Sequence, residues 1–151
     1  MRGDEDAFED LLARAIATYD RMSAAPIDDP RPVLLFLREM AGRAEQARSM
    51  LPDLERYFQF EDHWTTSLGE ARTTLAAGLG VLGEREAAAR LYQPLKEWTG
   101  TAGYVLTGAS SIPQLVSRAL GMAASAAGLA DEAERQFETA IHQAREMDAA
   151  T

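Results

Sequence analysis

LGMAASAAGLADEAERQFETAI, residues 120–141, contains the most informative pattern of the chain. Relative to Gly128, a leucine stands eight residues before, and Ala133, Phe137 and Ala140 stand five, nine and twelve residues after. Glycine adopts the left-handed conformation that ends a helix at little cost, and alanine lets two helices approach closely. The stretch therefore predicts two antiparallel helices joined by a tight turn.

The same pattern occurs twice earlier in the chain, around Gly42 and Gly83. The matching residues are Leu34, Ala47, Leu51 and Leu54 for the first unit, and Leu75, Ala88, Tyr92 and Leu95 for the second. The large residue at offset nine is expected to fill the space between one helix pair and the next. Because each pair leaves an apolar face uncovered, stacking of successive pairs is what completes the core.

Apolar residues at three- and four-residue steps predict helices along the whole chain. The expected helices span roughly 8–22, 32–40, 44–58, 68–82, 87–98, 113–127 and 130–147. Pro52 should kink or break the third helix, because proline lacks the backbone N–H and collides with the preceding turn. The Gly/Ser/Thr-rich stretch 99–113 is expected to be a loop, and nothing reads as a β-strand.

These patterns predict an all-α fold of about seven helices in one domain over residues 1–151, arranged as a right-handed stack of antiparallel helix pairs. The first helix would be the second half of an incomplete unit. On this reading the chain is a fragment of a larger multidomain protein.

The stretch LGMAASAAGLADEAERQF resembles the signature of the tetratricopeptide repeat (TPR), although the units here are longer than the usual ~34 residues. Residues 82–100 and 120–149 are similar to a C-terminal helical-repeat region of large actinobacterial signalling proteins. In those proteins the region follows an ATP-binding module, either in LuxR-type transcriptional regulators or in proteins with a class III nucleotide cyclase domain. The resemblance covers about residues 33–148, and it implies a regulatory part of a longer polypeptide.

Composition excludes several classes of function. The net charge is −9, and no segment carries the basic patch that direct nucleic-acid binding needs. The absence of cysteine excludes disulfides, thiolate metal sites and cysteine nucleophiles. No apolar run reaches the roughly 18 residues of a membrane span, and the N-terminus is acidic where a signal peptide is basic. The sequence therefore predicts a cytoplasmic protein that does not bind membranes.

No stretch carries a convincing catalytic, cofactor or metal motif. The segment 103–110 has two glycines at P-loop spacing but lacks the following lysine. Glu138 and His142 share a helical face, but no third metal ligand is identifiable nearby. His63 stands beside Asp62, and no positioned nucleophile accompanies them. We therefore expect no metal, no cofactor and no enzymatic activity.

The predicted function is a non-catalytic protein–protein interaction and regulatory module of a bacterial signalling or transcriptional regulator. Its concave surface would bind a protein or peptide partner, or neighbouring domains of the same polypeptide. The resemblance to the tetratricopeptide repeat implies that the contact residues lie on the first helix of each unit. Away from the leucine stripe, the candidates there are Phe36, Glu39, Glu70, Thr73, Arg118 and Met122. The alternative is a small-molecule-sensing helical domain with a ligand pocket near Trp98 and Tyr104.

Overall fold

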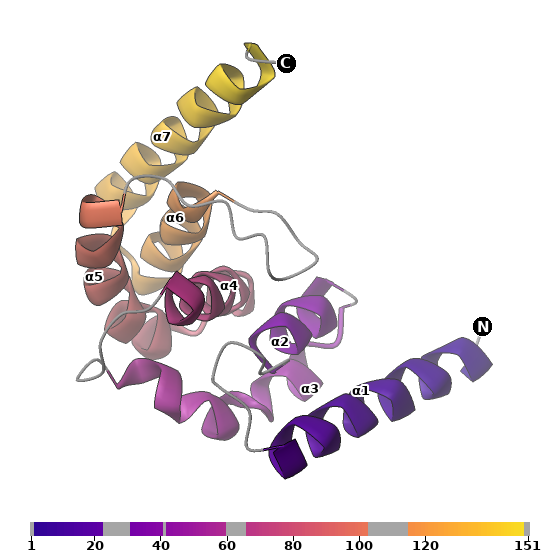
Figure 1. The fold of residues 1–151 in the computed structure, drawn as a ribbon. Coiled ribbons are helices and arrows are strands. Elements are labelled where there is room, and N and C mark those ends of the chain that lie inside the picture. The colour runs from indigo at the N-terminus through magenta and orange to yellow at the C-terminus, as the bar shows by residue number, and fades with distance from the viewer. Residues whose placement is uncertain (1, 23–30, 41, 60–65, 103–114, 150–151) are drawn as a thin grey trace.

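The computed structural model describes residues 2–22, 31–40, 42–59, 66–102 and 115–149. Within these ranges the chain forms eight helices and no β-strand (Figure 1). The helices are α1 (Arg2–Met22), α2 (Arg31–Met40), α3 (Ala44–Arg48), the 3₁₀ helix η2 (Leu51–Phe58), α4 (Thr66–Leu82), α5 (Arg85–Ala102), α6 (Val116–Ala127) and α7 (Ala130–Ala149). The predicted all-α character is confirmed.

The break that was expected at Pro52 is present. Helix α3 ends at Arg48, and η2 begins at Leu51 with the proline in its first turn. That position suits proline, since the first N–H groups of a helix have no partner within it. The helix that was predicted over residues 87–98 is longer than expected. Helix α5 continues through Ala102, and the rest of the expected loop 99–113 lies outside the described residues.

Three glycines end helices in the left-handed conformation. Their φ angles are 72° at Gly42, 69° at Gly83 and 81° at Gly128. At each turn the N–H of the following residue donates to the carbonyl five residues earlier, and these bonds are Arg43 to Arg38 (2.8 Å), Glu84 to Leu79 (3.2 Å) and Leu129 to Ala124 (2.9 Å). This is the long hydrogen bond of the Schellman motif. The three predicted turns are therefore built in the same way.

Most of the residues at the repeated offsets are buried, as predicted. The leucines before the glycines and the alanines after them are all buried: Leu34, Leu75, Leu120, Ala47, Ala88 and Ala133. At offset nine the outcome differs between units. Tyr92 is buried, Leu51 is half-buried and Phe137 keeps 37% of its surface exposed. The expectation that this residue fills the space between pairs therefore describes Tyr92 better than Phe137.

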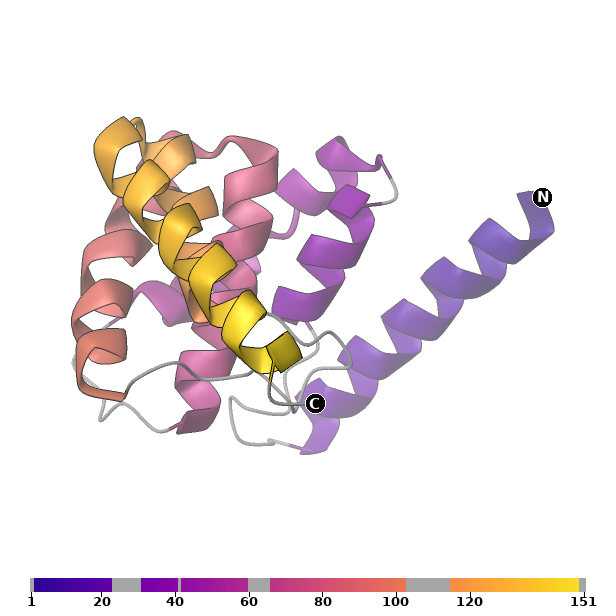
Figure 2. The ribbon, with the colours of Figure 1, turned by 90° about the horizontal axis from the view of Figure 1, so that it is seen from above.

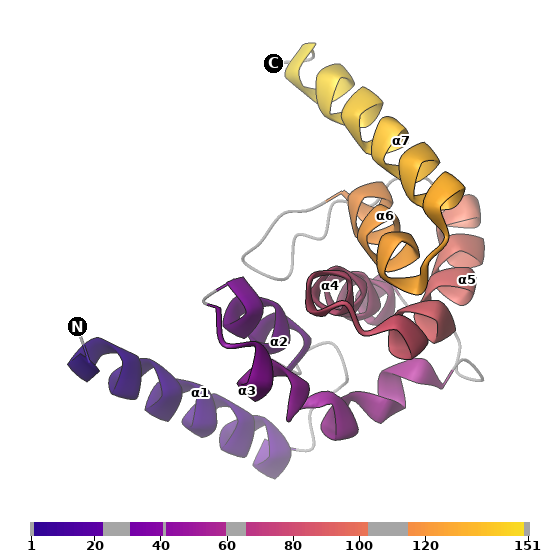
Figure 3. The same ribbon diagram turned by 180° about the vertical axis from the view of Figure 1, so that it is seen from behind.

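Helix α4 lies in the middle of the molecule. It packs against α2 on one side and α6 on the other, and α6 packs in turn against α5 and α7 (Figures 1 and 3). The first helices of the three units are thus in contact in chain order. One continuous cluster of buried residues extends from α2 to α7.

Glycines inside α4 allow this close packing. A Cβ atom added to Gly78 would come within 2.2 Å of Leu35 Cδ2 on α2. A Cβ atom on Gly80 would lie 2.6 Å from Met122 Cβ and 2.7–2.8 Å from the Met122 backbone on α6. Glycine normally lowers helix stability, and here it is needed because neighbouring helices occupy the space of a side chain.

Helix α1 projects away from the other helices (Figure 2). Ile16 packs against the core, whereas Leu11 is 57% exposed. Glu9 accepts hydrogen bonds from Arg38 and Arg43, each 2.5 Å long, and the Arg38 bond holds the pKa of Glu9 below its usual value. These two bonds join α1 to α2 and to the turn that follows Gly42. Among the helices of the described ranges, none combines the length and apolar character that crossing a bilayer requires.

Candidate functional site

Two of the predicted contact residues lie in the core, which corrects their assignment to a partner-binding surface. Phe36 is 6% exposed and belongs to the core cluster. Thr73 is fully buried, and its Oγ1 donates to the carbonyl oxygen of Gly69 at 2.7 Å. The physical reason is that α2, α5 and α6 all pack against α4. The buried face of α4 is therefore wider than one apolar stripe.

The other predicted contact residues have different surroundings. Arg118 on α6 is exposed, and Glu70 on α4 and Met122 on α6 are half-buried. The Cβ and backbone of Met122 face Gly80, so part of this residue supports the contact between α4 and α6. The side chain of Glu39 lies outside the described part of the structure.

The aromatic residues of the alternative ligand pocket are only partly described. Trp98 is half-buried, and its ring covers Gly69, where an added Cβ atom would lie 2.2 Å from the Trp98 Cη2 atom. This contact joins α5 to α4. Tyr104 lies outside the described residues, and so does His63.

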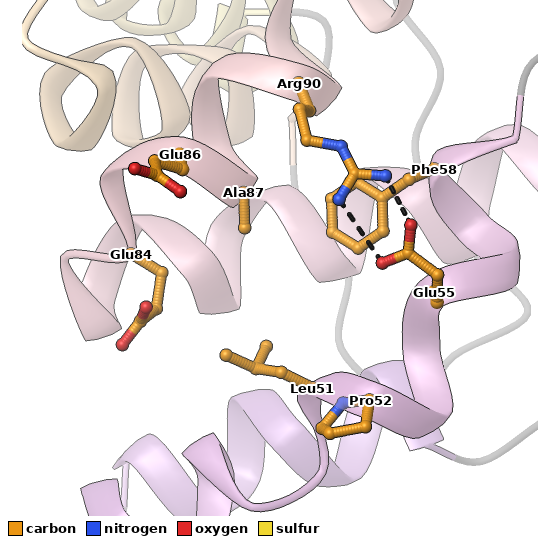
Figure 4. Close-up of a pocket in the computed structure, with 8 residues that line it drawn as sticks. All are labelled: Leu51, Pro52, Glu55, Phe58, Glu84, Glu86, Ala87 and Arg90. Carbon is orange, nitrogen blue, oxygen red and sulfur yellow. Dashed lines mark hydrogen bonds and ion pairs between the residues drawn. The ribbon is translucent and has the colours of Figure 1, made fainter.

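A hollow is found elsewhere, between η2 and the beginning of α5 (Figure 4). Its volume is about 300 Å³, and it is open to solvent. It is lined by Leu51, Pro52, Glu55, Phe58, Glu84, Glu86, Ala87 and Arg90. We call it the η2–α5 hollow. Helix η2, which begins at Leu51 with Pro52 in its first turn, supplies one wall. The Gly83 turn brings Glu84 and the first turn of α5 to the other wall.

One end of the η2–α5 hollow is closed by a paired arginine (Figure 4). Arg90 donates to both carboxylate oxygens of Glu55, with Nη2–Oε1 at 2.5 Å and Nη1–Oε2 at 3.3 Å. Its guanidinium also lies 4.6 Å from the centre of the Phe58 ring. The hydrogen bond lowers the pKa of Glu55 and raises that of Arg90. Two-point pairing combined with ring stacking gives the arginine a defined orientation.

A second arginine supports the opposite end. Arg48 Nε donates to Glu84 at 2.8 Å, its Nη1 donates to Glu45 at 2.8 Å, and its Nη2 donates to the carbonyl oxygen of Leu82 at 3.2 Å. Arg48 therefore connects α3 to the turn between α4 and α5, and it holds the Glu84 carboxylate at the rim of the hollow.

The η2–α5 hollow was not predicted from the sequence. Glu55 and Phe58 are three residues apart, as are Ala87 and Arg90, so each pair shares a helical face. That spacing is a weak signal, because the two pairs come together only where the fold places η2 beside the beginning of α5. The hollow offers apolar surface and carboxylates, and it contains no nucleophile with an adjacent base.

No metal site is formed by the residues that the structure describes. Within them, no group of three histidine, aspartate or glutamate side chains could hold a metal ion. His142 Nε2 lies 3.2 Å from Glu146 Oε1, so this histidine contacts the carboxylate one turn later rather than Glu138.

Helices α5 and α7 are connected by hydrogen bonds to the Glu132 carboxylate. Glu132 accepts hydrogen bonds from the Tyr92 hydroxyl at 2.5 Å and from Lys96 at 3.0 Å, and a third comes from Arg135. These donors, Tyr92 foremost, lower the pKa of Glu132 to about 2. Burial, and secondly the bond to Glu132, raise the pKa of Tyr92 to about 12.

The Glu132 contacts predict a specific acid dependence of stability. A carboxyl with a lower pKa in the folded chain stabilises the fold above its unfolded value near 4.5, and this contribution disappears as the pH falls toward 2. We expect Glu132→Gln to lower the melting temperature at pH 7 and to flatten its dependence on pH between 4.5 and 2. Glu138→Gln, at an exposed position of α7, is the control. An unchanged acid profile in Glu132→Gln would contradict the assigned hydrogen bonds.

The fold and the hollow define an all-helical protein with three glycine-turned helix pairs and a surface concavity lined by apolar and acidic side chains. Comparison with known proteins gives no match to a family model, to a curated protein or to a solved structure. What the chain does must therefore be inferred from its own residues.

Proposed function

We propose that this protein is a non-catalytic interaction and regulatory module, built as a right-handed TPR-like stack of helix pairs. The observation that carries the proposal is the repetition of one turn. Gly42, Gly83 and Gly128 end helices with the same left-handed geometry and the same long hydrogen bond, and the first helices α2, α4 and α6 pack in chain order. Repeats that contact only their neighbours form extended surfaces that serve for binding.

In the proposed module the first helices present the binding surface. Arg118 and Ser125 are exposed and lie seven residues apart on α6, which places them on one face of the helix. Glu70 on α4 and Met122 on α6 are partly accessible. An exposed cation, a carboxylate and a thioether together suit a partner segment with both polar and apolar side chains. Phe36 and Thr73 act in this proposal as core residues.

The partner is a protein or peptide, or a neighbouring domain of the same polypeptide in a cytoplasmic bacterial regulator. The predicted actinobacterial setting makes an ATP-binding or cyclase domain the natural neighbour. The module would then change the regulation of that neighbour while supplying no catalytic group itself.

Site-specific photo-crosslinking tests the proposed surface. A photoreactive amino acid is placed at Arg118 or Ser125, and at the exposed Ala89 on α5 as a control, in the full-length protein within its host cells. We expect one partner to be captured from both α6 positions and not from Ala89. We also expect Arg118→Glu to weaken the binding of that partner about tenfold. Capture of the partner from Ala89 alone, or catalytic turnover by the purified chain, would contradict the proposal.

A further inference from the structure

We propose that the η2–α5 hollow binds a cationic, amphipathic segment of a protein, with one apolar side chain in the hollow and lysine or arginine residues at its rim. This inference rests on the proposed function only in taking a protein as the partner. The surface is a different one, since it is formed by η2 and α5 instead of by α2, α4 and α6.

The floor of the hollow is apolar. Leu51 and Ala87 are half-buried, Pro52 is exposed, and Phe58 lies beneath Arg90 with 8% of its surface accessible. A volume of about 300 Å³ is at the lower end of the range for small-molecule sites. The hollow is also open, so it suits one inserted side chain more than an enclosed cofactor. Covering these four residues would remove apolar surface from water.

The rim is acidic, and its arginines are already engaged. Arg90 is held at two points by Glu55, and Arg48 is held by Glu84 and Glu45. An anionic ligand would have to displace these carboxylates before it could reach either guanidinium. With the exposed Glu86 included, the hollow and its paired neighbours carry four carboxylates against two guanidiniums. The local charge is therefore negative.

Other arginines close in sequence do not reverse this sign. Arg56 lies 5.2 Å from the centre of the Tyr57 ring and donates to the Tyr57 hydroxyl, outside the hollow. The Arg85 guanidinium lies beside Gly128, 3.2 Å from where a Cβ atom of that residue would be. The net charge of −9 adds a general attraction for cations. Charge complementarity therefore selects a basic partner segment.

Binding of short labelled peptides, followed by fluorescence anisotropy with the full chain, tests this inference. The probe peptide carries two leucines one helical turn apart, flanked by lysines. One control peptide has serines in place of the leucines, and another has glutamates in place of the lysines. We expect the probe to bind at least about tenfold more tightly than either control, because both the apolar anchor and the positive charges are needed. Equal binding of the serine peptide, or tighter binding of the glutamate peptide, would overturn the proposal.

Matched variants locate the binding on the protein. Ala87→Trp fills the hollow, whereas Ala89→Trp adds the same ring at an exposed position of the same helix. Glu86→Lys and Glu138→Lys change the net charge by the same two units, but only Glu86 lines the hollow. We expect Ala87→Trp and Glu86→Lys each to weaken binding of the probe peptide about tenfold. In the two control variants the affinity should change by less than about twofold. Circular dichroism establishes that each variant is folded.

Equal losses in Glu86→Lys and Glu138→Lys would show attraction by overall charge alone and would overturn the assignment to this hollow. Unchanged binding of the probe in Ala87→Trp would also overturn the assignment to this hollow. If the hollow fails while the partner is still captured from Arg118 and Ser125, only this inference is lost. If the probe peptide binds at the hollow but no partner is captured from Arg118 and Ser125, the hollow remains a peptide site and the surface proposed on the first helices is lost.

Discussion

Gly80→Ala is expected to lower the free energy of unfolding by about 2 kcal/mol. The new Cβ atom would lie 2.6–2.8 Å from Met122 Cβ, C and O, and a backbone cannot move aside as a flexible side chain does. Overpacking of this kind costs up to about 3 kcal/mol, and the better helix propensity of alanine returns about 1 kcal/mol. Urea unfolding followed by far-ultraviolet circular dichroism measures the difference. In a thermal melt the loss corresponds to a lower Tm by roughly 5 °C.

Double variants show whether the atoms that clash with the new Cβ atom belong to the backbone or to a side chain. Met122→Ala keeps its Cβ and carbonyl, so it should not relieve Gly80→Ala. By contrast, a Cβ atom on Gly78 meets Leu35 Cδ2, and the loss of stability from Gly78→Ala should therefore be smaller in a Leu35→Ala background.

Gly83→Ala separates the cost of a left-handed backbone conformation from the cost of a steric clash. Nothing lies within 4 Å of its Cβ position, so only the left-handed conformation opposes it, at about 1 kcal/mol. An unchanged free energy of unfolding in Gly80→Ala would contradict the close crossing of α4 and α6.

Arg72→Met is expected to destabilise the protein by about 3 kcal/mol. Arg72 is fully buried, its Nε donates to the carbonyl oxygen of Tyr57 at 2.9 Å, and its Nη2 donates to that of Gln59. Hydrogen bonds from a charged donor contribute about 1.5–3 kcal/mol each, and methionine leaves the carbonyls without this donor. Arg72→Lys should recover little, because one ammonium cannot reproduce the forked donor geometry.

Arg90→Met serves as the comparison, because Arg90 makes an ion pair that is exposed to solvent, and such pairs contribute little to stability. Native-state hydrogen exchange locates the damage. Loss of Arg72 should increase exchange in η2, where its carbonyl partner Tyr57 lies, before it affects α6 and α7. Equal destabilisation by the two variants would show that Arg72 does not anchor η2.

The candidate site was less predictable than the fold, and Phe36 and Thr73 show why. Both lie off the leucine stripe of their helices, so periodicity alone placed them on an open surface. Helix α4 is packed on several sides, and its residues from Arg72 to Leu79 are all buried. The number of neighbours around a helix depends on the whole arrangement, and a single-helix pattern does not contain it. Arg72 was overlooked for the same reason, since an arginine in a helix is ordinarily expected at the surface.

Features that depend on a few adjacent residues could be predicted from the amino-acid sequence. The left-handed turns at Gly42, Gly83 and Gly128, the helix break at Pro52 and the burial of the repeated leucines and alanines follow from backbone conformation and helical spacing. Three other features become visible only in the packed fold: which helices are in contact, why Gly80 must be glycine, and how Glu55 and Arg90 close one end of a hollow. Those features join segments far apart in the chain, and their contacts depend on how whole helices pack rather than on local preference.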